Sequence, residues 1–167
     1  MSQAQEAAFR SFAVTRRPVL RRTAYLLCGD WHQADDLVQT ALVKLYVAWS
    51  RVHSGESPDA YTHRILLRCF LDERRRPWRR ESPGEIVDGA TPDRPAEELL
   101  DLQGALARLP RRQRATLLCR FWLDAPVAET ADVLGCSEGT VKSQTARALS
   151  TLRELLGDQT LVTEESS

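Results

Sequence analysis

Residues 127–146 have the types and the spacing of a motif that reads DNA. Ala131 is small enough for two helices to cross closely. Gly135 follows four residues later, where a sharp turn needs a residue that accepts positive φ. Ser137 can cap the next helix through its hydroxyl, and Val141 would face back toward the first helix. We predict a helix-turn-helix whose second helix enters a major groove, with an ordinary helical hairpin as the alternative.

The predicted second helix leaves polar side chains on its outer face. Lys142 can meet a guanine edge or a phosphate, and Ser143 can donate or accept a hydrogen bond. Arg147 is placed to grip the sugar-phosphate backbone, and Ala146 can touch a thymine methyl. Gln144 lies among them and adds a neutral polar group.

Charge is distributed unevenly along a chain whose net charge is +0. Residues 60–80 hold seven arginines and two acids, residues 81–101 hold seven acids and one arginine, and residues 108–114 hold four arginines and no acid. Two basic blocks separated by an acidic segment suggest two polyanion-facing surfaces, with solvated helix faces as the alternative. Trp78, inside the first block, can stack on an exposed base or pack on the core.

Catalytic chemistry has little support in the sequence. The histidines at 32, 53 and 63 are scattered, and there is no nucleophile elbow, phosphate-binding loop or dinucleotide fingerprint. Asp35 and Asp36 are the only local pair of carboxylates, and adjacent helical residues point in different directions. We therefore expect a solvated or partner-binding surface there, no catalytic residue, no metal and no cofactor.

Cysteine usage and hydropathy bear on the compartment. The four cysteines (28, 69, 119 and 136) show no CxxC spacing, so we expect unpaired, buried thiols in a reducing compartment, with a redox switch as the alternative. No apolar run approaches the ~20 residues that span a bilayer, and the first twelve residues lack the apolar core of a signal peptide. These features predict a cytoplasmic protein without a membrane span.

The elements expected to position these residues are all helical. Period-2 alternation is absent, and Gly and Pro lie between segments, which predicts an all-α fold of two small helical domains. Pro18 is expected to kink or divide the first helix, and Asp30 to cap the second. The helices expected in the first half cover residues 5–28, 30–49 and 57–76, with a polar loop at 50–57.

The second half is expected to follow an acidic, flexible linker at residues 81–94. Its first helix carries Leu99 to Leu109, and Pro110 opens another helix that turns Leu117, Leu118 and Phe121 inward. The last helix of the helix-turn-helix is expected to end near Leu155, before a frayed tail. The predicted divisions are therefore residues 5–80, 81–94, 95–157 and 158–167.

Taken together, the two halves resemble the extracytoplasmic-function (group 4) sigma factors of bacterial RNA polymerase, most of all the actinobacterial SigE-like branch. The first half resembles sigma region 2 in AYLLCGDWHQADDLVQTALVKLYVAW and DAYTHRILLRCFLDERRR. The second half resembles sigma region 4 in LPRRQRATLLCRFWLD and LGCSEGTVKSQTARAL. The resemblance covers about residues 7–156.

The resemblance implies a non-enzymatic promoter-specificity subunit. It would bind core RNA polymerase, direct it to −10 and −35 elements and assist DNA melting by capturing single-stranded bases. The implied partners are promoter DNA, the clamp helices of the largest polymerase subunit and the flap of the second-largest subunit. The free chain is expected to be a monomer, and whether an anti-sigma factor silences it is left open.

The resemblance also assigns roles to residues. Residues 50–59 would hold a base flipped from the −10 element, which needs a pocket because unstacking costs a few kcal/mol. The implied −35 contacts are Ser137, Glu138, Thr140, Lys142, Ser143, Gln144, Ala146 and Arg147. The implied −10 contacts are Tyr61, His63, Arg64, Arg68, Arg74, Arg75, Arg76 and Trp78. The implied polymerase contacts are Asp35, Asp36, Gln39 and Thr40.

Three positions depart from the family pattern. Arg68 stands where many relatives carry Asn, which points to a different −10 preference. Thr130 replaces an aliphatic residue, so its hydroxyl needs a partner. Gln144 stands where Arg is frequent, which removes one charge from the DNA face.

Two other hypotheses remain open from the sequence. A free-standing helix-turn-helix regulator would bind duplex DNA without polymerase, as a dimer on a palindromic site. A helical adaptor would bind only protein, and charge reversal at Lys142 and Arg147 would leave its activity unchanged.

Overall fold

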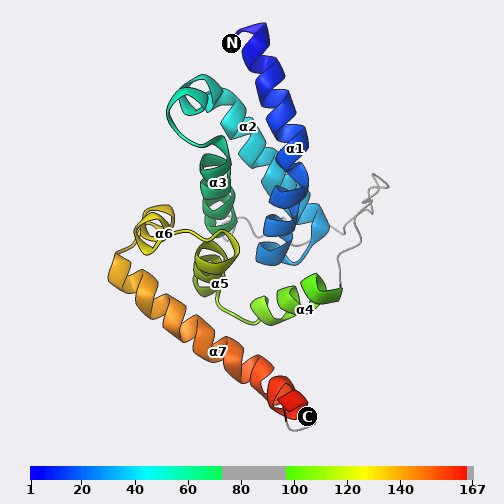
Figure 1. The fold of residues 1–167 in the computed structure, drawn as a ribbon, viewed down its shortest axis with the longest axis vertical. Coiled ribbons are helices and arrows are strands. Elements are labelled where there is room, and N and C mark those ends of the chain that lie inside the picture. Colours follow the sequence, from blue (N-terminus) through cyan, green and yellow to red (C-terminus); the bar gives the residue numbers. More distant parts are fainter. Residues whose placement is uncertain (73–96, 165–167) are drawn as a thin grey trace. The chain divides into compact units, whose positions relative to one another are not determined.

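A computed structural model describes residues 1–72 and 97–164 of the chain, and side chains as far as residue 157. The chain divides into two compact units, Met1–Pro92 and Asp93–Ser167. Every regular element in the described residues is a helix, which confirms the predicted all-α class (Figure 1). Each unit is described by itself.

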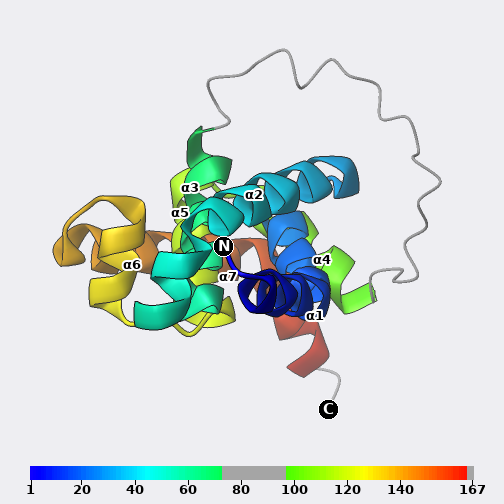
Figure 2. The same ribbon diagram turned by 90° about the horizontal axis from the view of Figure 1, so that it is seen from above.

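The first unit is built from α1 (Gln3–Cys28), α2 (Trp31–Gly55) and α3 (Pro58–Asp72). Ser2 caps α1 through a reciprocal pair of 3.1 Å hydrogen bonds with Gln5. Asp30 caps α2 as predicted, accepting from the amides of His32 and Gln33. Figures 1 and 2 show α2 lying beside both α1 and α3.

The core of the first unit lies where these three helices meet. It buries Leu20, Ala24 and Leu27 of α1, Leu37, Ala41, Leu45 and Trp49 of α2, and Leu66, Leu67 and Phe70 of α3. The buried turns of α1 after Pro18, together with the partly buried Phe9 and Phe12 before it, compensate for the hydrogen bond that Pro18 cannot donate. The predicted division at Pro18 is wrong, because α1 continues through it, and the alternative of a kink stays a prediction.

The predicted polar loop at residues 50–57 is also largely wrong. The helix α2 runs on to Gly55, so only residues 56 and 57 separate it from α3. Val52 is 1% exposed and joins Leu45 and Trp49 in one cluster, which extends the apolar stripe of the helix by a further turn. The predicted start of α3 is confirmed, since the Ser57 hydroxyl accepts from the amide of Ala60.

The second unit contains α4 (Glu97–Leu106), α5 (Arg111–Leu117), α6 (Val127–Leu134) and α7 (Glu138–Glu164). A π-helical turn, Leu118–Trp122, continues α5. Its core buries Ala105, Leu106, Leu109, Ala115, Leu117, Leu118, Ala131, Leu134, Val141 and Ala148. The helix α7 extends to Glu164, past the predicted end near Leu155, because no proline stops it and Gly157 costs only about 1 kcal/mol in a helix.

The π-helical turn corrects the prediction that Phe121 points inward. The amide of Leu123 donates to the carbonyl of Leu118 at 2.9 Å, a bond over five residues that shifts the helical register by one position. Leu117 and Leu118 are buried as predicted, but Phe121 is 60% exposed.

Candidate nucleic-acid interface

The helix-turn-helix predicted from the sequence is present in α6 and α7. Gly135 ends α6 in the left-handed conformation with φ 65°, and the amide of Cys136 donates to the carbonyl of Ala131 at 3.0 Å. The Ser137 hydroxyl accepts from the amide of Thr140 at 3.1 Å, which caps the start of α7. Val141 is 0% exposed, so it fixes the rotation of α7 about its axis.

That rotation leaves one polar face of α7 in solvent. Lys142, Ser143, Ala146 and Arg147 are all exposed, and Gln144 is half-buried. Among the described residues, Lys142 and Arg147 form no ion pair, so both cations remain available to a ligand. A helix with two unpaired cations and short polar side chains on one face can contact both base edges and phosphates.

Two further predicted −35 residues serve the turn itself. The hydroxyls of Ser137 and Thr140 lie 2.9 Å apart, and the Ser143 hydroxyl donates to the Thr140 carbonyl at 3.4 Å. Glu138 is exposed in the first turn of α7. A carboxylate there is stabilised by the helix dipole, and it would repel a nearby phosphate.

Two arginines of the basic block at residues 108–114, which the charge pattern suggested to face a polyanion, donate to backbone carbonyls instead. Arg112 donates to the carbonyl of Leu134 at 2.8 Å, and Arg114 donates to the carbonyl of Leu109 at 3.1 Å. Arg120, further along, donates to the carbonyl of Ala125 at 2.5 Å. These guanidinium groups bind backbone within the second unit, a use that sequence spacing does not reveal.

In the first unit, the −10 candidates Tyr61 and Arg64 lie together on α3. The guanidinium carbons of Arg64 and Arg51 lie 5.2 Å and 5.8 Å from the centre of the Tyr61 ring. Arg64 also pairs with Glu56 at 2.8 Å. A half-buried aromatic ring with two cations close to it can contact the base of a nucleotide while the cations meet the neighbouring phosphates.

His63 was predicted to line the same surface, and its position corrects that prediction. It is only 6% exposed, and its Nδ1 lies 2.9 Å from the carbonyl oxygen of Asp59. Burial lowers the pKa of His63, against the opposing effect of the Asp59 carboxylate. The carboxylate of Asp59 is held by Arg16 at 2.7 Å. His63 is thus part of the packing between α3 and α1.

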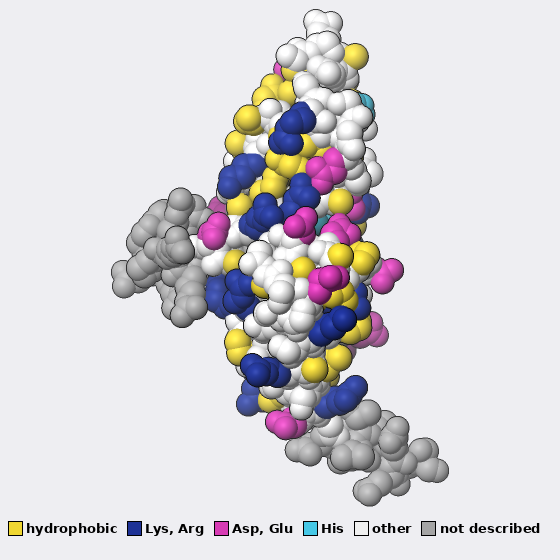
Figure 3. Space-filling model, turned by 90° about the vertical axis from the view of Figure 1, so that its left-hand side faces the viewer, with side chains coloured by type: hydrophobic (Ala, Val, Ile, Leu, Met, Phe, Trp, Pro, Cys, Tyr) yellow, Lys and Arg dark blue, Asp and Glu magenta, His cyan; other side chains and the backbone are white. Residues whose placement is uncertain are grey.

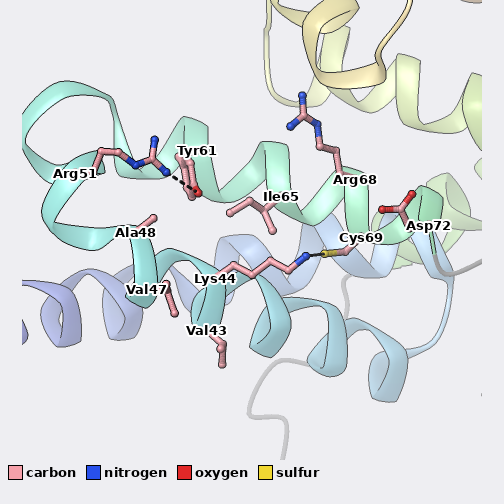
Figure 4. Close-up of a pocket in the computed structure, with 10 residues that line it drawn as sticks. All are labelled: Val43, Lys44, Val47, Ala48, Arg51, Tyr61, Ile65, Arg68, Cys69 and Asp72. Atoms are coloured by element: carbon pink, nitrogen blue, oxygen red, sulfur yellow. Dashed lines mark hydrogen bonds between the residues drawn. The ribbon is translucent and has the colours of Figure 1, made fainter.

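A groove of about 620 Å³ runs between α2 and α3 of the first unit (Figure 4). It is lined by Val43, Lys44, Val47, Ala48, Arg51, Tyr61, Ile65, Arg68, Cys69 and Asp72. Arg51 reaches the Tyr61 hydroxyl at 3.4 Å, and Lys44 reaches the Cys69 sulfur at 3.8 Å. The upper part of Figure 3, which belongs to this unit, shows Lys and Arg side chains around a strip of hydrophobic ones.

The remaining −10 candidates divide into two groups. Arg68 is exposed on α3, beside the groove. Arg74, Arg75, Arg76 and Trp78 lie outside the described residues.

The residues predicted to contact polymerase lie on α2, and its two carboxylates, Asp35 and Asp36, differ in their ion pairing. Asp35 accepts from Arg21 at 2.6 Å and 3.4 Å, and the same guanidinium lies 4.4 Å from the centre of the Trp31 ring. Trp31 in turn stacks on Tyr25 at 4.1 Å. Asp36 forms no ion pair within the described residues, and it is half-buried. Asp35 thus stabilises the packing of α1 on α2, whereas Asp36 is available to a partner.

Two residues on α2 were missed by the sequence analysis. Val43 is 57% exposed and Val47 is 82% exposed, and they lie one turn apart on the side that carries Gln39 and Thr40. Their signal was available, because both positions fall outside the buried stripe of Ala41, Leu45 and Trp49. These two valines leave apolar side chains exposed one turn apart on this side of α2.

The described part of the chain contains neither a candidate metal site nor a candidate membrane-spanning helix. No group of three His, Cys, Asp or Glu residues there could hold a metal ion. No helix there is long and apolar enough to cross a bilayer. No disulfide joins cysteines within the described part of the chain; only Cys119 is buried, whereas the sequence predicted burial for all four, and the other three are half-buried.

The comparisons with known proteins identify the family of each unit. Residues 13–80 match the family Sigma-70 region 2, and residues 99–152 match Sigma-70, region 4. The fold and the helix-turn-helix therefore define a bacterial transcription initiation factor of the sigma-70 class. The chain belongs to the extracytoplasmic-function RNA polymerase sigma factors, as its relatives indicate.

Among these relatives is the RNA polymerase sigma-E factor of Streptomyces avermitilis, 35% identical over 96% of this chain and 92% of that protein. The sigma factor SigM of Mycobacterium tuberculosis is 34% identical over 83% of this chain and 71% of that protein. The sigma factor RpoE of Bartonella quintana, solved with the anti-sigma factor NepR, has a TM-score of 0.71 and 28% identity over 90% of this chain and 97% of that one.

Membership of this family decides between the hypotheses left open by the sequence. The chain is a sigma factor, which binds core RNA polymerase and promoter DNA in transcription initiation. Nothing in the matches supports a free-standing regulator.

Proposed function

We propose that the two units of this sigma factor read the two promoter elements separately, the second unit at −35 and the first at −10. The observation that carries the proposal is that α7 has one buried face and one exposed face. Val141 and Ala148 are fully buried, while Lys142 and Arg147 are exposed. Such a helix has one rotation about its axis, so it presents one set of side chains to a major groove.

At the −35 element, Lys142 and Ser143 contact base edges and Arg147 contacts a phosphate. The central positions of the face carry Ala146 and the half-buried Gln144, which reads a base more weakly than an arginine would. Ser137, Glu138 and Thr140 sit at the helix start and set how closely the backbone approaches the DNA.

At the −10 element, a base leaves the duplex and stacks beside Tyr61, between Arg51 and Arg64. The groove volume of about 620 Å³ falls in the range of sites that accept a molecule of this size. Arg68, along the same groove, is placed to neutralise a phosphate of the displaced strand. Arg74, Arg75, Arg76 and Trp78 extend this contact along the strand. Base capture would open the DNA without nucleotide hydrolysis, and we assign the chain no catalytic step.

Polymerase binding is assigned to the exposed side of α2. Asp36, Gln39 and Thr40 supply polar contacts to the clamp helices, and Val43 and Val47 supply an apolar centre. Asp35 acts there by holding the helix through Arg21. The helices at the front of the second unit meet the flap of the second-largest subunit.

The functional boundaries proposed from the sequence stay as they were: residues 5–80 for polymerase and −10 binding, 81–94 as linker, 95–157 for −35 binding, and a tail from 158. The family matches at residues 13–80 and 99–152 support the divisions at 5–80 and 95–157. We place the protein in the cytoplasm, where polymerase acts. We also propose an anti-sigma factor as a partner, because the similar structure from Bartonella quintana is a complex with one.

The −35 assignment is tested with reconstituted holoenzyme and a promoter fragment. Lys142→Ala and Arg147→Ala should each weaken binding, and Arg147→Ala should reduce the slope of log K against log salt by about 0.9, the contribution of one phosphate contact. Binding that matches the unaltered holoenzyme in both variants would refute the assignment.

The polymerase-binding assignment is tested with a matched pair of valines. Val47→Asp should weaken binding to core polymerase by about tenfold, because a charge would enter an apolar contact. Val14→Asp is the control, since Val14 is 71% exposed and belongs to α1 rather than α2. Equal affinities for the two variants would contradict the assignment.

A further inference from the structure

We propose that Arg112 and Arg120 are positioning residues that hold α6 at its two ends and thereby set the angle at which α7 meets the −35 element. The inference rests on the proposed −35 role of α7. It assigns two arginines of the second unit to the geometry of the helix-turn-helix, with no contact to DNA.

The first observation lies at the C-terminal end of α6. The chain leaves the helix at Gly135, so the carbonyl of Leu134 has no donor one turn further along the same helix. Arg112, on α5, supplies that donor through Nη2 at 2.8 Å. A guanidinium is favoured there also because the carbonyl end of a helix carries partial negative charge.

The second observation lies at the other end of α6. Arg120 donates through Nη1 to the carbonyl of Ala125 at 2.5 Å, directly before Pro126, the N-cap of α6. The preceding residue, Asp124, has φ 53°, a left-handed conformation that non-glycine residues adopt at a cost and that surrounding contacts must maintain. Arg120 makes such a contact, and α6 is therefore held from both sides.

The position of α6 determines the position of α7. The two helices pack on each other, with Ala131 on α6 and Val141 on α7 buried. A tilt of α6 would carry Lys142 and Arg147 out of register with the major groove. The contacts of α7 with the DNA major groove depend on how far its side chains reach. Loss of Arg112 or Arg120 should therefore lower the affinity for the −35 element without removing a contact with DNA.

The competing explanation is a direct contact between Arg112 and a phosphate, since Arg112 is exposed to solvent. The two explanations differ in their salt dependence. A phosphate contact adds about 0.9 to the slope of log K against log salt, whereas a positioning residue adds nothing to it.

The test uses reconstituted holoenzyme and two promoter fragments, one with both elements and one that lacks the −35 duplex. Arg112→Gln and Arg120→Gln should each lose on the order of tenfold in affinity on the complete fragment, with an unchanged salt slope. Both should bind the shorter fragment as the unaltered holoenzyme does. Arg108→Gln is the matched control, because Arg108 is an exposed arginine of the same block whose side chain forms no hydrogen bond or ion pair within the described residues.

Three results would overturn the inference. One is a salt slope reduced by about 0.9 in Arg112→Gln, which would mean a phosphate contact. Another is affinity equal to that of Arg108→Gln. The third is an equal loss on both fragments, which would mean a general loss of folding. If circular dichroism shows that Arg112→Gln does not fold, Arg112→Lys replaces it and Arg120→Gln is kept. Each of these two variants should still lose affinity only on the complete fragment.

The same assay separates this inference from the proposed function. If Lys142→Ala and Arg147→Ala bind the complete fragment normally, the −35 role itself fails. If those two variants lose affinity and the Arg112 and Arg120 variants do not, only the positioning inference fails.

Discussion

The adjacent acids Asp35 and Asp36 should respond differently to the same substitution. Asp35→Asn keeps the shape of the side chain but removes the charge that pairs with Arg21. Asp36→Asn removes a charge that has no ion-pair partner in the described residues. We therefore expect the first change to lower the stability of the first unit and the second to lower polymerase affinity alone.

The size of the stability loss follows from the burial of the pair. The Arg21 side chain is 17% exposed and the Asp35 side chain is 40% exposed, and their closest atoms lie 2.6 Å apart. Exposed pairs contribute about 0–1 kcal/mol, and breaking a fully buried pair costs about 3–5 kcal/mol. A pair between these limits, nearer the exposed one, gives about 1 kcal/mol. Without the Asp35 carboxylate, the Arg21 guanidinium would also be held less firmly against the Trp31 ring, whose centre lies 4.4 Å away.

Urea unfolding of the full chain measures this effect. With a denaturant dependence of about 1 kcal/mol per molar, Asp35→Asn should lower the midpoint of the first unit by about 1 M. Asp36→Asn should leave the midpoint unchanged and weaken binding to core polymerase. Equal midpoints for the two variants would refute the structural role of Asp35, and undiminished polymerase binding by Asp36→Asn would refute the contact assigned to Asp36.

Three further predictions concern buried groups. Because burial lowers the pKa of His63, the unfolded chain takes up a proton before the folded chain does as the pH falls below 6.5. The free energy of unfolding should then fall by up to about 1.4 kcal/mol per pH unit. Denaturation curves of His63→Asn should lack this part of the pH dependence. Thr130→Val should leave urea stability unchanged or raise it by up to about 1 kcal/mol, because the Pro126 carbonyl that accepts the hydroxyl also accepts the Thr130 amide; a loss beyond that would contradict this account. Burial raises the pKa of Cys119 to about 12, so mass spectrometry after brief maleimide treatment at neutral pH should find Cys136 labelled and Cys119 unlabelled.

The helix-turn-helix was predictable from the sequence because its constraints are local. Gly135 must adopt positive φ, Ser137 must cap the next helix, and Val141 must return to the core, and each requirement acts within a few residues. Asp30 and the Ser57–Pro58 pair marked helix starts for the same reason.

Most of the errors arose where contacts distant in sequence decide the outcome, and one arose from a local shift in hydrogen bonding. Val52 extends α2 because it packs in a cluster with residues of α1, which no local pattern reports. The π-helical turn that exposes Phe121 depends on one shifted hydrogen bond. The charge pattern suggested a polyanion-facing surface at residues 108–114, and it did not reveal that the Arg112 guanidinium donates to a carbonyl 22 residues away.

Burial likewise separates side chains that the sequence treats alike. Tyr61 and His63 lie two residues apart on α3, and the helical turn places the first at the groove and the second against α1. Asp35 and Asp36 are divided by the same geometry. A sequence pattern predicted the region of the interface, and only the packing shows which of its members are free to bind.

The most direct test of the account is run-off transcription with purified core polymerase on a template that carries the chain's own upstream region. The account predicts a transcript of defined length only when the chain is added, and its loss when Lys142 and Arg147 are both changed to Glu. A transcript that does not depend on the chain, or one that persists undiminished with the doubly substituted chain, would contradict it.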